Sequence, residues 1–284
     1  MTILDGKMLS NKIKENLKKD IEEFKNNTCV VPCLKIILVG ENLASQTYVK
    51  NKIKACDFVG MDSEVIRLSE EISEEKLLDL INSLNNDVSV HGIIVQLPLP
   101  RHINDQKVID AISEDKDVDG FGILNKGKLF SSLDCLGSAT PKGIIRLLEE
   151  YNIPLSGRHA VVVGRSNIVG RPMAQMLLQK DATVTVCHRK TKDLAIYTKM
   201  ADILVVAVGK AKLITKDMVK EGAVVVDVGT NRVDGIMCGD VDFEEVKNVA
   251  SYITPVPGGV GPLTIASLLE NTFVACKKLQ KKVG

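Results

Sequence analysis

Short runs of apolar, β-branched residues alternate with stretches of helical periodicity along almost the whole chain. In the first half these patterns predict strands over residues 34–40, 63–68 and 91–99, with amphipathic helices over 44–58 and 73–86. A second series predicts strands over residues 159–164, 182–188, 202–209, 223–229 and 250–256. Apolar strands that alternate with helices are typical of a parallel sheet covered on both faces. The sequence therefore predicts an α/β fold.

The two series are separated by a segment rich in turn residues and charges. DKDVDGFG at 115–122 and the stretch that follows it, to Ser138, break the alternation. A helix is expected near 141–151, and a final helix from Pro262 to Lys282, with proline at its start and lysines at its end. We expect two α/β domains flanking a cleft. The first is 1–138, completed by the C-terminal helix from about 263 to 284, and the second, 139–262, is a Rossmann-like doubly wound parallel sheet.

Composition narrows the class of ligand. The 284 residues are 45% hydrophobic, enough to fill two cores, and 37 Lys plus Arg balance 36 Asp plus Glu. This balance gives no electrostatic reason to expect a nucleic acid or a membrane as a partner. The amino terminus lacks the apolar region of a signal peptide, and the longest apolar runs are of strand length, so neither export nor a membrane span is expected. A small molecule is the expected ligand.

Cysteine and histidine spacing indicates neither disulfides nor a metal site. The seven cysteines form no C-x-x-C pair, which favours reduced thiols in a cytoplasmic protein. The four histidines lie far apart in the sequence, and no pair has the spacing of metal ligands. We therefore expect no metal.

A glycine-containing turn follows the first strand of the second series. In GRSNIVGRP at 164–172, Gly164 permits a tight strand-to-helix turn, and Gly170 lets the helix approach closely. The amides of such a turn can hold a pyrophosphate. The spacing is wider than that of G-x-G-x-x-G, so an ordinary βα turn remains an alternative.

The next strand ends without the acidic residue that usually binds the ribose 2′-hydroxyl of NAD. Arg189, with Arg165 from the first turn, offers donors suited to a 2′-phosphate, which favours NADP. Solvated loop arginines are the alternative interpretation. Val208-Gly209 and 228–230 close the two following strands, where a nicotinamide and its ribose would lie, although such glycines also end strands that have no ligand nearby.

The first half contains a tyrosine and a lysine on one helical face. Tyr48 and Lys52 are four residues apart in the predicted helix. Tyr-x-x-x-Lys also marks short-chain dehydrogenases, but there the pair follows the glycine turn, and here it precedes it. A core tyrosine with a lysine that extends to solvent is the alternative interpretation.

Three further segments carry polar or rigid features at the ends of predicted elements. Gln96, in HGIIVQLPLP, ends an apolar strand, where burial alone does not explain an amide. Asp119, in DVDGFG, has the position of an ordinary turn residue. TPVPGGVGPLT at 254–264 holds three glycines and three prolines, a rigid loop whose backbone can approach a flat ligand.

Together, five segments resemble the bifunctional methylenetetrahydrofolate dehydrogenase/methenyltetrahydrofolate cyclohydrolase family. They are Tyr48-x-x-x-Lys52, VQLPLP around Gln96, DVDG at Asp119, GRSNIVGRP at 164–172 and PVPGGVGPLT at 255–264. The resemblance spans nearly the whole chain, in the right order. It implies oxidation of 5,10-methylenetetrahydrofolate with NADP and hydrolysis of the methenyl product to 10-formyltetrahydrofolate. It also implies a cytoplasmic homodimer that associates through its cofactor domains.

The resemblance also implies roles for single residues. The pteridine ring would stack near Tyr48, and Asp119 would accept hydrogen bonds from its amino-pyrimidine edge. Lys52, tuned by Gln96, would be the central catalytic group, kept neutral by burial and by the cationic substrate. The folate-binding set would also include Leu97, Pro98, Pro257, Gly258, Gly259, Val260 and Thr264. The dinucleotide contacts would be Gly164, Arg165, Ser166, Arg189 and Thr230.

The sequence departs from some relatives at two positions and is compatible with two alternative functions. Some relatives carry serine in place of Arg189 and isoleucine in place of Thr230. A two-domain dehydrogenase of a hydroxy or amino acid would share the dinucleotide half, but would not require the other motifs together. A non-catalytic folate-binding or NADP-sensing protein is the second alternative.

Overall fold

The computed structural model describes residues 1–283, which fall into two compact units. Unit 1 comprises residues 1–10 and 140–264, and unit 2 comprises residues 11–139 and the chain from 265 onward. Residues 1–10, expected in the first domain, belong to unit 1 because β1 (Thr2–Ile3) pairs in parallel with β11 (Tyr252–Ile253). None of the helices within residues 1–283 is long and apolar enough to cross a membrane.

Unit 2 contains a three-stranded parallel sheet. Its order is β3 (Asp62–Leu68), β2 (Cys33–Val39) and β4 (Gly92–Val95). Its helices are α1 (Gly6–Thr28) and α10 (Val260–Val283), which both begin in unit 1, and α2 (Leu43–Val59), α3 (Glu74–Asn86), α4 (Asp105–Asp110) and α5 (Ile123–Phe130).

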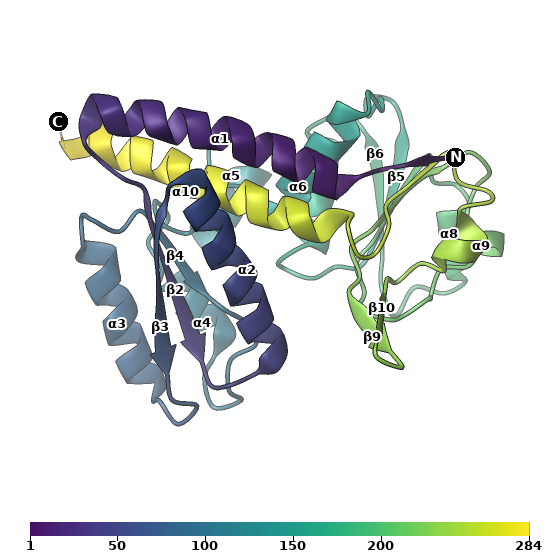
Figure 1. Ribbon diagram of the computed structural model, residues 1–284. Coiled ribbons are helices and arrows are strands. Elements are labelled where there is room, and N and C mark those ends of the chain that lie inside the picture. The colour runs from purple at the N-terminus through teal and green to yellow at the C-terminus, as the bar shows by residue number, and fades with distance from the viewer. Residues whose placement is uncertain (284) are drawn as a thin grey trace. The chain divides into compact units, whose positions relative to one another are not determined.

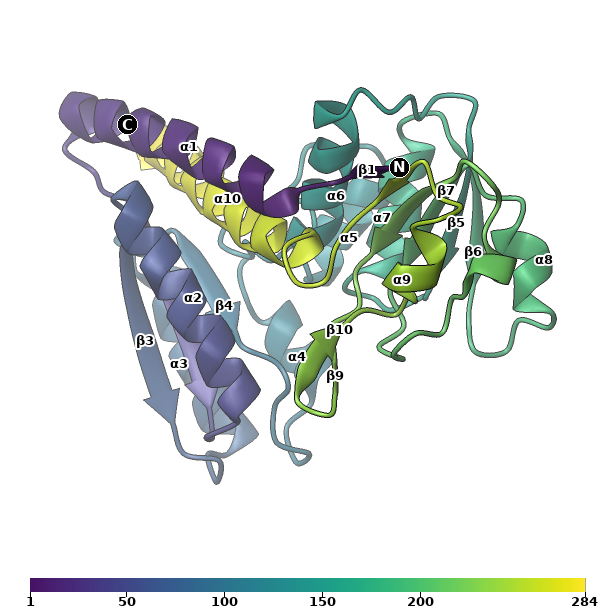
Figure 2. The same ribbon diagram turned by 45° about the vertical axis from the view of Figure 1, so that its right-hand side comes forward.

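Alternate residues of β2 face opposite sides of this sheet, as the strand period requires. Leu34, Ile36 and Leu38 pack in one buried cluster with residues of α1, α2 and α10. Ile37 and Val39 pack in a second cluster with residues of α3. Helices α1 and α10 run side by side, the first purple and the second yellow in Figure 1, and Figure 2 shows the same pairing. The sheet is thus buried on both faces, which explains its nearly continuous apolar strands.

Unit 1 is built on a six-stranded parallel sheet in the order β1-β11-β8-β7-β5-β6. Its remaining strands are β5 (His159–Val163), β6 (Thr183–Cys187), β7 (Ile203–Val206) and β8 (Val224–Asp227). A hairpin follows, made of β9 (Asn231–Val233) and β10 (Ile236–Cys238). The helices are α6 (Ala139–Glu150), α7 (Gly170–Leu178), α8 (Leu194–Thr198) and α9 (Phe243–Val246), with a 3-10 turn over Lys216–Met218.

The strand order identifies where this sheet can bind a ligand. From β5 the chain moves to β6 on one side, then crosses to β7 on the other. The order β6-β5-β7-β8-β11 is the 2-1-3-4-5 arrangement of doubly wound folds, and its switch point lies between the carboxyl ends of β5 and β7. The predicted class, two α/β units with a doubly wound parallel sheet in the C-terminal half, is confirmed.

Several predicted elements differ in extent from the observed ones. The strand predicted over 91–99 ends at Val95, because the chain leaves the sheet at Gln96 and then passes through the cis peptide bond between Leu97 and Pro98. The strand predicted over 250–256 is reduced to β11. The segment that separates the two predicted series of strands contains a helix, α5, where no helix was expected. Helix α1 was also not among the predicted helices.

Candidate active site

A buried lysine and a glutamine form a hydrogen-bonded pair in unit 2. Lys52 Nζ donates to Gln96 Oε1 at 3.1 Å, and only 8% of Lys52 is exposed. Gln96 Nε2 donates to the carbonyl oxygen of Leu97 at 2.9 Å, so the amide oxygen is the atom that faces the lysine. The two residues predicted to act together are therefore in direct contact.

The local chain path explains this contact. Gln96 directly follows β4, and its backbone N–H donates to the carbonyl of Ile37 in β2. The helix that carries Lys52, α2, begins just after the carboxyl end of β2, where Asn42 accepts the N–H of Ser45 as the N-cap. Gln96 therefore lies at the carboxyl edge of the sheet, where open α/β sheets bind ligands, and α2 starts from the same edge and brings Lys52 into contact with it.

Asp119 supplies a negative charge close to the same lysine. Its side chain is half-buried, and no described residue donates a hydrogen bond to its carboxylate. Burial raises the pKa of the Asp119 carboxyl. The nearby charge of Lys52 acts to lower this pKa, and the charge of Asp117 acts to raise it. Carboxylates with a raised pKa cluster at functional sites, and the partly exposed oxygens of Asp119 remain available to a ligand. Asp119 is thus positioned to accept hydrogen bonds from a ligand.

The segment that carries Asp119 is held rigidly by buried polar contacts that the sequence did not predict. Lys116 Nζ donates to three backbone carbonyls at the end of α3, at 2.7 to 2.9 Å. The Asp117 carboxylate accepts the N–H groups of residues 121 and 122 and the side-chain amide of Asn125. Asn271, in α10, donates to the carbonyl of Val118 at 2.8 Å. These bonds fix the backbone on both sides of the carboxylate.

Tyr48 lies one helical turn before Lys52 on α2 and is 43% exposed. Leu97 is half-buried and accepts a hydrogen bond from Ser45, and Pro98 is exposed. The spacing prediction therefore holds for Tyr48 and Lys52, which share a helix face, with the ring in contact with solvent and the amine buried.

The glycine–proline loop lies in unit 1, whereas the other predicted folate-binding residues lie in unit 2. Pro257 is exposed, Gly258 has a positive φ of +107°, and the Cβ of any residue replacing Gly259 would lie 2.6 Å from a backbone carbonyl oxygen. Val260 begins α10, and the hydroxyl of Thr264 lies 2.9 Å from that of Thr140. Gly259 thus packs closely against the backbone of this loop, and its approach to a flat ligand stays a prediction.

The predicted phosphate-binding turn has the expected geometry. Gly164 follows β5 with φ of +129°, and a Cβ there would lie 2.2 Å from the carbonyl oxygen of Ala207. A Cβ on Gly170 would lie 2.2 Å from the carbonyl oxygen of Gly164. The Ser166 hydroxyl accepts the N–H groups of Val169 and Gly170 as α7 begins. Only glycine fits at 164 and 170, so the turn can approach a dinucleotide closely.

The two predicted arginines follow neighbouring strands. Arg165 follows β5 and Arg189 follows β6, and Gly164 N–H donates to the carbonyl of Cys187 at 2.9 Å, which joins the two strand ends. Both side chains are exposed, as is Thr230 after β8. These positions fit an NADP molecule bound at the switch point, with cations available for its 2′-phosphate.

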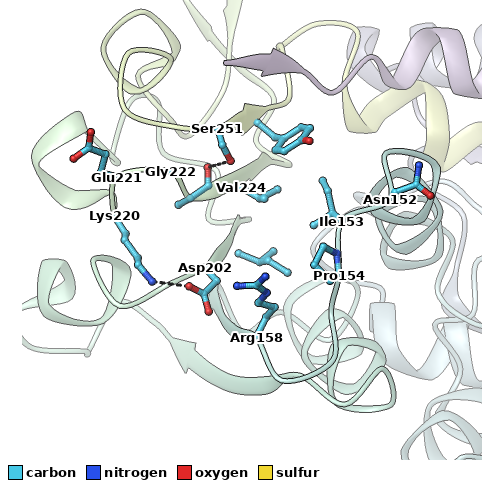
Figure 3. Close-up of a pocket in the computed structure, with 13 residues that line it drawn as sticks. Asn152, Ile153, Pro154, Arg158, Asp202, Lys220, Glu221, Gly222, Val224 and Ser251 are labelled. Carbon is cyan, nitrogen blue, oxygen red and sulfur yellow. Dashed lines mark hydrogen bonds and ion pairs between the residues drawn. The ribbon is translucent and has the colours of Figure 1, made fainter.

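A pocket of about 340 Å³ lies at the opposite edge of the same sheet (Figure 3). Its lining includes Arg158, Asp202 and Ser251, which precede or begin β5, β7 and β11, and Lys220 pairs with Asp202 at 2.6 Å. Because dinucleotides bind at the carboxyl ends of parallel strands, this amino-end pocket is not the predicted cofactor site.

Asp227, the last residue of β8, is a buried carboxylate whose titration should affect stability. It accepts the N–H groups of Gly229, Asp240 and Val241, and burial raises its pKa to about 6. The folded chain then holds a proton that the unfolded chain releases near pH 4. The contribution of Asp227 to the free energy of unfolding is therefore complete below about pH 4 and is lost as the pH rises through about 6.

We expect the free energy of unfolding of the wild-type chain, minus that of Asp227→Asn, to fall by about 2 kcal/mol between pH 4 and 7. Urea unfolding of both chains at each pH measures this difference. A difference that does not change with pH would contradict the shifted titration of Asp227.

The fold and these contacts define a class of protein. Unit 1 has the glycine turn and switch point of a dinucleotide-binding domain, and unit 2 has a buried lysine beside a carboxylate that accepts no hydrogen bond from the described residues. This combination is that of a two-unit α/β enzyme that uses a dinucleotide and a second, small substrate.

Comparison with known proteins identifies the family. The tetrahydrofolate dehydrogenase/cyclohydrolase catalytic domain matches residues 4–119, and the NAD(P)-binding domain of the same family matches residues 138–280. The chain belongs to the tetrahydrofolate dehydrogenase/cyclohydrolase family. Its similarity to the bifunctional protein FolD of Francisella philomiragia is 58% identity, over 99% of this chain and 100% of the relative.

Solved structures agree with this assignment. The FolD methylenetetrahydrofolate dehydrogenase/cyclohydrolase of Campylobacter jejuni is 56% identical, with a TM-score of 0.96 over 98% of this chain and 99% of that one. The Trypanosoma brucei enzyme, solved with NADP and an inhibitor, is 34% identical, with a TM-score of 0.94 over 98% of both chains.

Proposed function

We propose that this chain oxidises 5,10-methylenetetrahydrofolate with NADP and hydrolyses the methenyl product to 10-formyltetrahydrofolate. The observation that carries the proposal is the contact of buried Lys52 with Gln96, close to the donor-free carboxylate of Asp119. Family membership over nearly the whole chain supports it. The domain roles are part of the proposal: residues 139–262 bind NADP, and residues 1–138 with the helix from about 263 bind folate.

In the dehydrogenase step the bound NADP supplies the hydride acceptor. The chain binds and orients the dinucleotide through the turn at Gly164, Arg165 and Ser166, with Arg189 and Thr230 at neighbouring strand ends. No protein group has to take a proton when the methylene carbon gives up a hydride. The chain contributes mainly by holding the two reactants in the right orientation.

In the cyclohydrolase step the chain moves protons. Water adds to the methenyl carbon, and Lys52 is the group that takes a proton from that water. As the bond from this carbon to N5 breaks, N5 receives a proton, and loss of the hydroxyl proton leaves the formyl group on N10. The hydrogen bond from Lys52 to Gln96 Oε1 holds the amine in place beside the glutamine.

The remaining folate-binding residues recognise the ring and do not move protons. Asp119 accepts hydrogen bonds from the amino-pyrimidine edge, since its carboxylate takes none from the described residues. The exposed ring of Tyr48 provides a flat surface for stacking. Leu97 and Pro98, which directly follow Gln96 in the chain, belong to the same proposed set. The family resemblance also names Pro257 to Val260 and Thr264, which belong to the glycine–proline loop of unit 1.

Two initial-rate assays on the purified chain test the function. The first follows reduction of NADP on addition of methylenetetrahydrofolate, and the second follows loss of methenyl absorbance without any dinucleotide. We expect both reactions to be catalysed. A dehydrogenase of hydroxy or amino acids would show neither, and a folate-binding protein without activity would bind both ligands and turn over none.

Arg189→Asp should raise the KM for NADP by about tenfold or more and change the KM for NAD much less, because a carboxylate repels the 2′-phosphate. Arg158→Asp, which makes the same charge change at the amino edge of the same sheet, is the control and should change neither KM. Steady-state kinetics with each cofactor measure both values. Equal effects on NADP and NAD would remove Arg189 from 2′-phosphate recognition.

A cytoplasmic homodimer that associates through the NADP-binding domains completes the proposal. All seven cysteines are free thiols, which is compatible with a reducing compartment. Sedimentation of the purified chain should give twice the mass of one chain, and a mass that stays monomeric at assay concentrations would exclude the dimer.

A further inference from the structure

A buried carboxylate organises the loop that follows β7. Asp240 is 0% exposed, and its Oδ2 accepts the N–H groups of Val208 and Gly209 at 2.7 and 3.0 Å. Its Oδ1 accepts the N–H of Lys210 at 2.8 Å and the side-chain amide of Asn231 at 2.9 Å. Three consecutive backbone amides therefore point at one side chain, which fixes the conformation of the loop.

This loop lies at the switch point of the sheet. Ala207, which begins it, donates its N–H to the carbonyl of Val163 at the end of β5. The carbonyl oxygen of Ala207 is also the atom that a Cβ on Gly164 would approach to 2.2 Å. The loop after β7 thus packs directly on the phosphate-binding turn, at the place where doubly wound sheets hold a dinucleotide.

A second carboxylate holds Asp240 in place. The backbone N–H of Asp240 donates to Asp227 at 2.9 Å, as do those of Gly229 and Val241. A Cβ on Gly229 would lie 2.3 Å from Asp240, and one on Gly239 would lie 1.8 Å from Asp227. The loop after β8 and the residues that follow β10 are built around these two side chains. Figure 2 labels the β9–β10 hairpin that connects them.

The chemistry of the arrangement points to ordering of the loops as its purpose. No lysine or arginine among the described residues pairs with either carboxylate. Backbone N–H groups therefore supply nearly all of the hydrogen bonds that replace the lost hydration of Asp227 and Asp240. Burying two carboxylates in this way is costly, and an apolar core would stabilise the sheet more simply. What an apolar residue cannot do is hold three successive amides in one conformation.

We propose that Asp240 is a positioning residue for the dinucleotide: it pre-orders Val208 to Lys210 so that this loop meets the nicotinamide end of NADP without rearrangement. The inference rests on the proposed use of NADP at this edge. Pre-ordering raises affinity because the loop loses no conformational freedom on binding. Asp240 touches neither reactant and acts only through the loop.

Asp240→Asn is the sharpest variant. Both carboxylate oxygens accept N–H groups, so the amide nitrogen of asparagine faces a donor whichever way it is placed. Asp234→Asn is the matched control. It makes the same isosteric change at the exposed tip of the hairpin, where φ is +50° and asparagine is readily accommodated.

Two readouts on the full chain separate positioning from loss of structure. Calorimetric titration with NADP should show that Asp240→Asn weakens binding by about tenfold or more, whereas Asp234→Asn binds like the wild type. Hydrolysis of methenyltetrahydrofolate without dinucleotide should stay within about twofold of wild type in both variants, because that step uses Lys52 in unit 2.

Unchanged NADP affinity in Asp240→Asn would overturn the proposal, and so would a parallel loss of NADP binding and hydrolysis, which would mean a general structural role. If that variant does not fold, Asn231→Ala decides, since it removes one donor to Asp240 and leaves the backbone amides intact. It should weaken NADP binding several-fold, and unchanged binding would again refute the role. A wild-type chain that binds NADP but has no folate activity would defeat the proposed function alone.

Discussion

Replacing Lys52 by methionine is expected to lower cyclohydrolase turnover by about a hundredfold or more, the usual contribution of a positioned acid–base group. Methionine has a similar unbranched shape and suits a buried position, so the chain should still fold and bind NADP. Hydride transfer moves no proton to the protein, so dehydrogenase turnover should fall much less. Loss of methenyl absorbance in a stopped-flow cell measures the first effect.

Lys50→Met is the control for this variant, because Lys50 lies on the same helix with its side chain exposed. It should leave both activities close to the wild-type values. Hydrolysis at the wild-type rate by Lys52→Met would remove Lys52 from the mechanism and leave its contact with Gln96 without a catalytic purpose.

Asp119→Asn should lower kcat/KM for the folate substrate in both reactions by about 10- to 100-fold, as expected for the loss of hydrogen bonds to a charged group. The NH2 group of the asparagine amide is a hydrogen-bond donor, so it cannot accept a hydrogen bond from the donors of the amino-pyrimidine edge. The same loss in both activities is expected because both use one folate. Steady-state kinetics of the two reactions provide the measurement.

Asp79→Asn makes the same substitution at an exposed position of α3 and should have no effect on either reaction. NADP affinity should not change in either variant, because the dinucleotide turn lies in unit 1. An unchanged KM for folate in Asp119→Asn, or a loss confined to NADP binding, would show that this carboxylate does not recognise the pteridine.

The sequence predicted the sheet strands well where burial on both faces makes them continuously apolar. The prediction over 159–164 matches β5 within one residue, because valines fill that strand. The prediction over 91–99 extends β4 too far, since Leu97, Pro98 and Leu99 are still apolar although the chain has left the sheet. Helix α1 was missed although Leu9, Ile13, Leu17 and Ile21 recur every fourth residue, because dense charges surround them.

The site could be predicted only as far as its chemistry lies in short motifs. Lys52 and Gln96 stand out by type and position, and the structure places them in contact. The bonds that hold Asp119 depend on residues far away in sequence: Asn271 reaches Val118 across 153 positions. The role of Asp240 likewise arises only when the hairpin folds back on the β7 loop. Such long-range polar contacts leave no periodic signal in one sequence.

The central claim is that one folate molecule passes through two steps on one chain, with Lys52 acting in the second. It is tested most directly by recording NADPH and the methenyl compound together after methylenetetrahydrofolate and NADP are mixed with the enzyme. The rate at which the methenyl compound hydrolyses without enzyme is subtracted. The wild type should form NADPH while the methenyl compound stays low, and Lys52→Met should form the two in equal amounts. Methenyl accumulation that is the same in both chains, or no folate-dependent NADPH in the wild type, would contradict the account.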